Sequence, residues 1–142
     1  VQTDHTNAER IRRDRLQAHA VEAAEQCGAT YVPEVADLMP LSRVLDDWPA
    51  GRVLVYADEA RAGQASPLSG LLVAKDARAG GGAPSPAALL VGPEGGLSEA
   101  ERARLASLPF AEPLALGPRI LRADTAAVAA LTLWQATRGD WR

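Results

Sequence analysis

The stretch that most constrains the fold covers residues 88–101 and reads ALLVGPEGGLSEAE. Its short apolar run ends at turn residues, which predicts a strand buried on both faces, as in a parallel sheet. The glycines that follow allow backbone angles closed to other residues and let another molecule approach the main chain. Ser98 and Glu101 have the spacing of a capping box, which predicts a helix start. Open α/β sheets bind ligands at such carboxyl-end loops, so we predict a ligand loop here; the alternative is a glycine-rich turn without a ligand.

A second strand-loop-helix pattern lies nearer the C-terminus. Residues 112–116 predict a strand, Gly117 and Pro118 a turn, and residues 126–137 a helix capped by Asp124 or Thr125. Apolar side chains surround much of this helix, which predicts burial on several sides. In a chain of 142 residues, that favours contact with a partner subunit.

The remaining elements follow from periodicity and turn residues, and together they predict a single α/β domain. A helix is expected from about Thr6 to Cys27, capped by Thr6 with Glu9 and ended by Gly28. Helical spacing predicts another helix from Leu41 to Trp48. Further predictions are strands at residues 30–35 (broken or edge-placed at Pro33) and 53–56, a helix at 68–77 and a surface loop at Gly80, Gly81 and Gly82.

Composition excludes several classes of protein. With 15 basic and 18 acidic residues, the chain is not a uniformly basic nucleic-acid binder, although a local patch remains possible. Arginines 10, 12, 13 and 15 form a solvated helix face or, alternatively, contact an RNA backbone. The single cysteine, Cys27, forms no internal disulfide and is expected to be a buried thiol. No apolar run approaches the roughly 20 residues of a membrane span, so the predicted location is cytoplasmic.

Known catalytic patterns are mostly missing. The dinucleotide and phosphate-loop glycine patterns are absent, the serines lack a nucleophile elbow, and neither His5 nor His19 has a metal-ligand set beside it. Asp58 and Glu59 follow a predicted strand on the side where α/β sheets bind ligands, although loop solvation explains them equally well. There remain two backbone-rich loops that suit a flat heteroaromatic ligand, beside Glu94, Arg119, Arg122, Asp124 and Thr125.

Two motifs closely resemble those of the ribosomal small-subunit methyltransferase E family: Gly92-Pro93-Glu94-Gly95-Gly96, and Leu116-Gly117-Pro118-Arg119-Ile120-Leu121-Arg122 before a Thr-Ala helix start. Residues 22–27 and Gly139-Asp140-Trp141 are similar too, so the resemblance covers nearly the whole chain. It implies an S-adenosylmethionine (SAM)-dependent enzyme that methylates N3 of a uridine in 16S rRNA of the small ribosomal subunit. It also implies a SPOUT-type parallel-sheet domain with a deep C-terminal trefoil knot, and a homodimer formed through the C-terminal helix.

The resemblance further implies a cofactor pocket built from three segments. Backbone groups of Leu116, Gly117, Ile120 and Leu121 would hold the adenine. The implied cofactor-binding residues are Tyr56, Ala57, Asp58, Glu59, Val91, Gly92, Pro93, Glu94, Gly95, Gly96, Leu116, Gly117, Ile120, Leu121 and Thr125.

Three residues are candidates for catalysis. Arg122 could stabilise the developing uridine anion or anchor a phosphate, and Glu94 or Asp124 could accept the N3 proton. The alternative is that Glu94 caps a loop and Asp124 caps a helix. The family often has Thr-Glu-Thr-Ala after the arginine, whereas this chain has Ala123-Asp124-Thr125-Ala126. The first hydroxyl is lost and the acid is one carbon shorter.

Family members usually carry an N-terminal PUA-like RNA-binding domain and an opening catalytic segment, neither of which is recognisable here. Residues 1–142 are therefore expected to be a SPOUT domain without them.

Two other functions stay open. The chain could methylate another RNA position, such as a ribose 2′-hydroxyl. It could also be a non-catalytic RNA-binding or dimerisation module.

Overall fold

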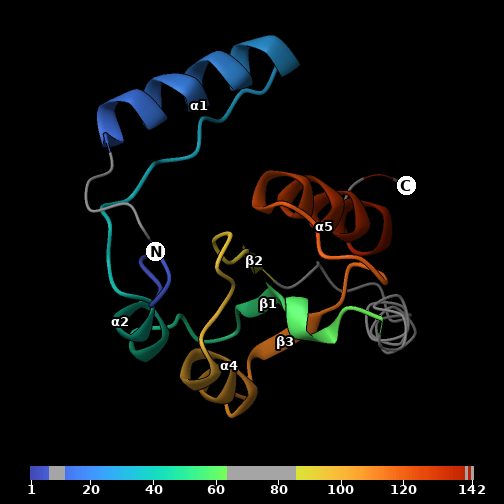
Figure 1. Cartoon of the computed structure of the whole chain (residues 1–142). Helices are drawn as coiled ribbons and strands as arrows, with labels where there is room; N and C mark the ends of the chain where they lie inside the picture. Colours follow the sequence, from blue (N-terminus) through green and yellow to red (C-terminus); the bar gives the residue numbers. More distant parts are fainter. Residues whose placement is uncertain (7–11, 64–85, 140, 142) are drawn as a thin grey trace. The chain divides into compact units, whose positions relative to one another are not determined.

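The computed structural model describes residues 1–6, 12–63, 86–139 and 141 (Figure 1). The chain forms two compact units. The first unit comprises Val1–Gln2 and Thr6–Asp47, and the second comprises Thr3–His5 and Trp48–Arg142. The predicted helix at residues 68–77 and the predicted loop at residues 80–82 lie outside the described residues.

Two helices form the regular part of the first unit: α1 (Arg13–Cys27) and α2 (Leu41–Asp46). Both were predicted. Gly28 ends α1 with a φ of 69°, as expected for a left-handed helix stop. In the described residues α1 begins at Arg13, and its N-cap residue Arg12 provides no side-chain cap. Residues 7–11 of the predicted helix lie outside the described residues. The expected partner in the cap, Glu9, lies outside the described residues.

Two expectations for the first unit are wrong. Residues 30–35 form no strand, because the side chain of Gln17 binds the backbone there: it donates to the Pro33 carbonyl at 3.1 Å and accepts from the Val35 amide at 2.8 Å. Cys27 is exposed rather than buried. Of the described α1 residues only Ala24 is buried, so the packed face of this helix is too narrow to include Cys27.

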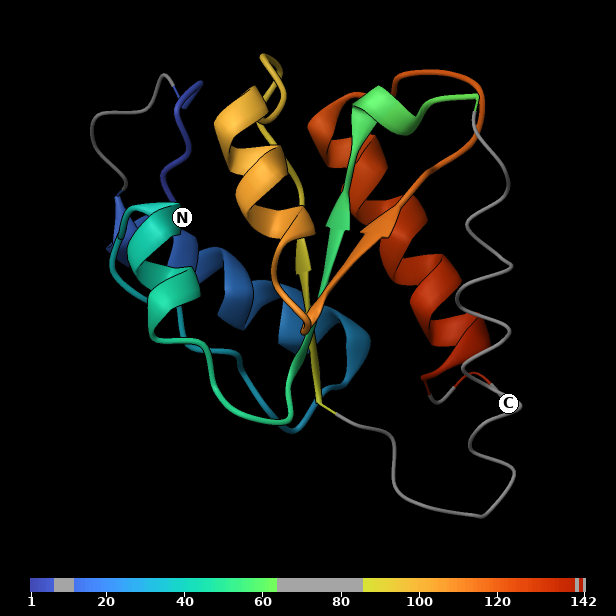
Figure 2. The ribbon, with the colours of Figure 1, turned by 90° about the horizontal axis from the view of Figure 1, so that it is seen from below.

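A three-stranded parallel sheet forms the centre of the second unit, in the order β2-β1-β3 (Figure 2). The strands are β1 (Val53–Ala57), β2 (Ala87–Leu90) and β3 (Ala111–Leu114). In the observed register Val55 lies opposite Leu89 of β2 and Glu112 of β3. All three strands were predicted, and their parallel arrangement confirms the predicted α/β class.

Helices cover both faces of this sheet: Figure 1 shows α5 (Ala123–Thr137) above the strands and α4 (Glu99–Ala106) below them. Val55 packs with Leu114 and with Ala130 of α5. Because side chains alternate along a strand, Tyr56 points to the other face, the side of α4, where Leu105 is fully buried.

The two helices start differently. Ser98 and Glu101 form the predicted capping box of α4, with bonds of 3.1 and 2.8 Å. By contrast, α5 begins three residues before the predicted position 126, and its N-cap residue Arg122 provides no side-chain cap. The predicted cap at Asp124 or Thr125 is therefore wrong, since both residues lie in the first turn of the helix. Among the described residues, no helix is long and apolar enough to cross a membrane.

Candidate functional site

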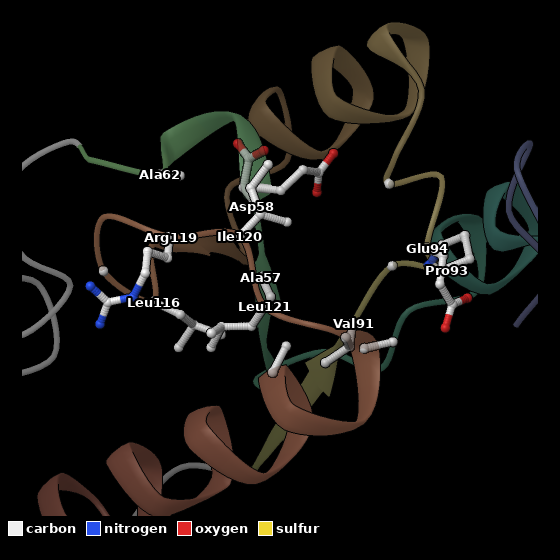
Figure 3. Close-up of a pocket in the computed structure, with 16 residues that line it drawn as sticks. Ala57, Asp58, Ala62, Val91, Pro93, Glu94, Leu116, Arg119, Ile120 and Leu121 are labelled. Carbon is white, nitrogen blue, oxygen red and sulfur yellow. The ribbon is translucent and has the colours of Figure 1, made fainter.

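A pocket lies where the carboxyl ends of the three parallel strands meet. Three segments line it: the end of β1 with the short helix η1 (Glu59–Arg61), the glycine loop after β2, and the loop between β3 and α5 together with the start of α5 (Figure 3). The lining residues are Ala57, Asp58, Glu59, Ala62, Val91, Gly92, Pro93, Glu94, Gly96, Leu116, Gly117, Arg119, Ile120, Leu121, Ala123 and Ala126.

Gly96 shapes the glycine loop through its left-handed backbone conformation. Its φ of 70° is left-handed, and its amide donates to the Pro93 carbonyl at 2.8 Å. A Cβ at this position would lie 2.2 Å from Oε1 of Glu59. The backbone angle therefore favours glycine, and any side chain at this position would displace the carboxylate of Glu59.

Glu59 ties the end of β1 to the glycine loop. Its Oε1 accepts from the Leu97 amide at 3.3 Å and pairs with Nη1 of Arg102 at 3.3 Å. The same guanidinium donates to the Leu97 carbonyl. Arg102 on α4 thus holds both Glu59 and the loop, and one oxygen of Glu59 is engaged in maintaining the pocket wall.

Asp58 is the most buried acid of the pocket. It accepts from the Ala60 amide at 3.2 Å, which caps η1, and pairs with Nε of Arg61 at 3.4 Å.

Burial raises the pKa of the Tyr56 phenol, the Asp58 charge raises this pKa further, and the Arg61 charge lowers it. Because desolvation is the larger effect, the phenol stays neutral at physiological pH.

The third wall, residues 116–122, is a loop that folds back onto the first. Gly117 has a φ of 103°, and its carbonyl accepts from the Gly63 amide at 3.1 Å. Ile120 leaves 74% of its surface exposed although it lines the pocket. The loop therefore presents an apolar side chain and backbone groups to a ligand in the pocket.

Charge is distributed unevenly around the pocket. Three carboxylates, Asp58, Glu59 and Glu94, line it together with one cation, Arg119. Glu94 and Arg119 lie at opposite ends, with Asp58 between them (Figure 3). Such a pocket suits a ligand with an apolar part and a positive charge. Within the described chain, no three His, Cys, Asp or Glu side chains gather as a metal site.

All of the predicted cofactor-binding residues line the pocket except Tyr56, Gly95 and Thr125. Tyr56 is buried in the core, where its side chain belongs to the packing of the sheet. The carbonyl of Gly95 faces His5. Thr125 lies in the first turn of α5, where its amide and hydroxyl donate to Asp124 at 2.7 and 3.2 Å.

Of the three candidate catalytic residues, one lines the pocket and two lie outside its lining. Glu94 lines the pocket, whereas Arg122 and Asp124 do not belong to its lining. Arg122 and Asp124 form an exposed ion pair of 3.8 Å at the start of α5. They follow directly after the lining residue Leu121.

Sequence reasoning missed several lining residues: Ala62, Ala123 and Ala126, and Arg119, which was noted beside the loops but not assigned to the pocket. Alanine carries no chemical signal, so only the folded chain reveals its position. The role of Arg102 was also missed. An arginine in an exposed helical pattern looks like any solvated residue until its partners are known.

Comparisons with known proteins identify the family of the chain. Residues 1–135 match the family described as RNA methyltransferase domain. Ribosomal RNA small subunit methyltransferase E of Bacillus subtilis (strain 168) is 35% identical over 126 residues, covering 85% of this chain and 45% of that protein.

Solved structures show the same fold. Ribosomal RNA small subunit methyltransferase E from Neisseria gonorrhoeae, bound to S-adenosyl methionine, is 28% identical with a TM-score of 0.70, covering 92% of this chain and 50% of that chain. A Legionella pneumophila protein solved with the bound cofactor SAM is 25% identical with a TM-score of 0.71, covering 94% of this chain and 52% of that chain. The chain thus spans about half the length of these relatives.

The family match covers nearly all of the chain, and the solved relatives share its fold. The chain therefore belongs to the RNA methyltransferase domain family, and it is similar within that family to the ribosomal small-subunit methyltransferase E enzymes.

Proposed function

We propose that this chain binds SAM and methylates N3 of a uridine in 16S rRNA of the small ribosomal subunit, in the cytoplasm. The pocket at the carboxyl edge of the parallel sheet carries the proposal. It is built from backbone-rich glycine loops, in a fold whose solved relatives include proteins with SAM bound.

The lining residues fit such a cofactor. Leu116, Ile120 and Leu121 provide apolar contacts for an adenine, whose edge can bond to the loop backbone. The carboxylates of Asp58 and Glu94 complement the positive charge of a sulfonium and an ammonium group.

SAM supplies a methyl group that is already activated on sulfur. The main task of the protein is then to align that group with the uridine nitrogen and to exclude other geometries. N3 of uridine carries a proton that must be removed. Of the two proposed acceptors, Glu94 lines the pocket and Asp124 does not, so we place Glu94 first in this role.

Arg122 remains the proposed cation for the uridine anion or for an RNA phosphate. Its side chain is 81% exposed, so RNA can reach it, and its ion pair with Asp124 limits the directions in which it can point. Asp124 would in that case orient Arg122 rather than accept the proton. Arg119, inside the pocket lining, is a second positive charge available to the substrate.

The test separates cofactor binding from transfer. We expect calorimetry to show SAM binding by the wild-type chain, by Arg122→Ala and by the exposed control Arg43→Ala on α2. Binding by Glu94→Gln should be weaker, because this variant removes a carboxylate from the pocket lining. Transfer from labelled SAM to 16S rRNA should fall in Arg122→Ala and Glu94→Gln by about 100-fold or more. Transfer should be unchanged in Arg43→Ala. Full transfer by Arg122→Ala would exclude it from the reaction.

The same measurements distinguish the competing functions. No SAM binding by the wild-type chain would favour a non-catalytic RNA-binding or dimerisation module. Binding with transfer to a ribose 2′-hydroxyl, mapped on the product RNA, would favour another RNA target. Methylation at a uridine N3 is the outcome expected here.

We further propose a homodimer formed through α5, together with the trefoil knot expected from the family. Val128 and Leu131 on α5 leave 67% and 53% of their surfaces exposed, an apolar face that a second copy would cover. For the knot, the Gly63 amide donates to the Gly117 carbonyl, so the loop before α5 contacts the segment after η1, where a threaded chain would cross.

A further inference from the structure

The glycine loop is held from two sides. Glu59 and Arg102 hold one side, as described above. On the other side, Nδ1 of His5 lies 2.8 Å from the Gly95 carbonyl and 3.2 Å from the Gly96 carbonyl. Carbonyl oxygens only accept hydrogen bonds, so Nδ1 must carry the hydrogen. In the neutral ring this leaves Nε2 as the acceptor.

Hydrogen bonds of the adjacent residue Asp4 fix the position of His5. The Asp4 amide donates to Oε1 of Glu101 at 2.9 Å, and the Ser98 hydroxyl donates to Oδ2 of Asp4 at 2.6 Å. Both partners belong to the capping box of α4. These hydrogen bonds therefore anchor the segment Thr3–His5 at the start of α4. From this position the imidazole contacts the glycine loop.

The loop leaves room for this ring. A Cβ at Gly95 would lie 3.0 Å from the Cβ of His5, tighter than ordinary van der Waals contact, so the close approach depends on glycine. Gly95 does not line the pocket, but Glu94 and Gly96 on either side of it do. A bond to the Gly95 and Gly96 carbonyls thus acts on the pocket wall through the main chain.

We propose that His5 is a positioning residue that holds the Gly95–Gly96 turn in the conformation that forms the ligand pocket. The effect on the loop stands on this geometry alone, whereas its consequence for SAM rests on the function proposed above. The imidazole does not touch the ligand. It acts by donating one hydrogen from Nδ1 to the two carbonyls.

Hydrogen exchange in the ligand-free protein tests the loop directly. In His5→Ala, the Gly96 and Leu97 amides should exchange about two- to tenfold faster, the size expected for losing one net hydrogen bond. The amide of Ala130 in the core of α5 serves as the reference for global unfolding. His19→Ala, the other histidine, is the matched control and should leave the loop unchanged.

Two conservative variants keep the test decisive. The amide nitrogen of His5→Asn falls where Nδ1 lies, so this variant should restore slow exchange, whereas His5→Gln places its amide one carbon further and should not. SAM affinity measured by calorimetry should follow the same order, with a two- to tenfold loss in His5→Ala and in His5→Gln.

The exchange and affinity measurements separate the effect of His5 on the loop from its effect on ligand binding. Unchanged loop exchange in His5→Ala, or equal rescue by Asn and Gln, would overturn the proposal. Faster exchange with unchanged SAM affinity would overturn its link to the ligand site. If the wild-type chain did not bind SAM, the proposed function would fail, and the exchange data would still decide whether His5 holds the loop. If His5→Ala did not fold, the comparison of Asn with Gln would decide.

Discussion

Replacing Gly96 by alanine should disrupt the pocket wall in two separable ways. The φ of 70° places the new side chain in the left-handed region, which costs about 1–2 kcal/mol for a residue with a Cβ. The new Cβ would also lie 2.2 Å from Oε1 of Glu59. Glu59 must then swing away and give up its contacts with the Leu97 amide and Arg102.

The second cost can be estimated from the bonds lost. Hydrogen bonds to a charged group contribute about 1.5–3 kcal/mol. Because the Glu59 and Arg102 side chains retain 30% and 32% of their exposure, we reduce this to about 1–2 kcal/mol. Gly96→Ala should therefore lower the free energy of unfolding by about 2–4 kcal/mol. It should also weaken SAM binding, because the displaced carboxylate belongs to the pocket lining.

Gly51 provides the matched control. Its φ is 78°, and a Cβ there would meet nothing within 4 Å, so Gly51→Ala carries only the backbone cost of about 1–2 kcal/mol. Urea unfolding followed by tryptophan fluorescence would measure both variants, with and without Glu59→Ala. The excess cost of Gly96→Ala should disappear in the Glu59→Ala background. Equal costs for the two glycine variants, or an excess that survives removal of Glu59, would refute this reasoning.

Three further predictions concern stability and assembly. Ser98→Ala should lower the free energy of unfolding by about 1 kcal/mol, seen as a lower Tm, because α4 loses its capping box; an unchanged Tm would show that the cap is not needed. Val128→Asp combined with Leu131→Asp should shift the chain to a monomer in sedimentation with unchanged circular dichroism, because the apolar face of α5 becomes charged; an unchanged mass would argue against a dimer through α5. Burial raises the pKa of Tyr56, so the folded state keeps the phenol neutral to higher pH than the unfolded chain. Its stabilising effect is complete below pH ~10 and is lost as pH rises above that value; Tyr56→Phe should remove this alkaline loss in unfolding curves, and an identical pH dependence in the variant would contradict the assignment.

Local signals were sufficient for much of the fold. The three strands, the α4 capping box and the stop at Gly28 were predicted because each depends on residues adjacent in sequence. The errors arose where side chains distant in sequence decided the outcome. Gln17 binds the backbone of the expected strand at residues 30–35, and the narrow packed face of α1 leaves Cys27 exposed.

The sequence by itself determined that glycine loops follow parallel strands, and its motifs identified the family. Tertiary structure alone decided how those loops are held. Glu59, Arg102 and His5 come from three separate places in the chain, and no local pattern reports that they converge on residues 95–97. Hydrogen bonds and steric contact act over a few ångströms in space, whatever the separation along the chain, so the support of the pocket becomes visible only once the chain has folded.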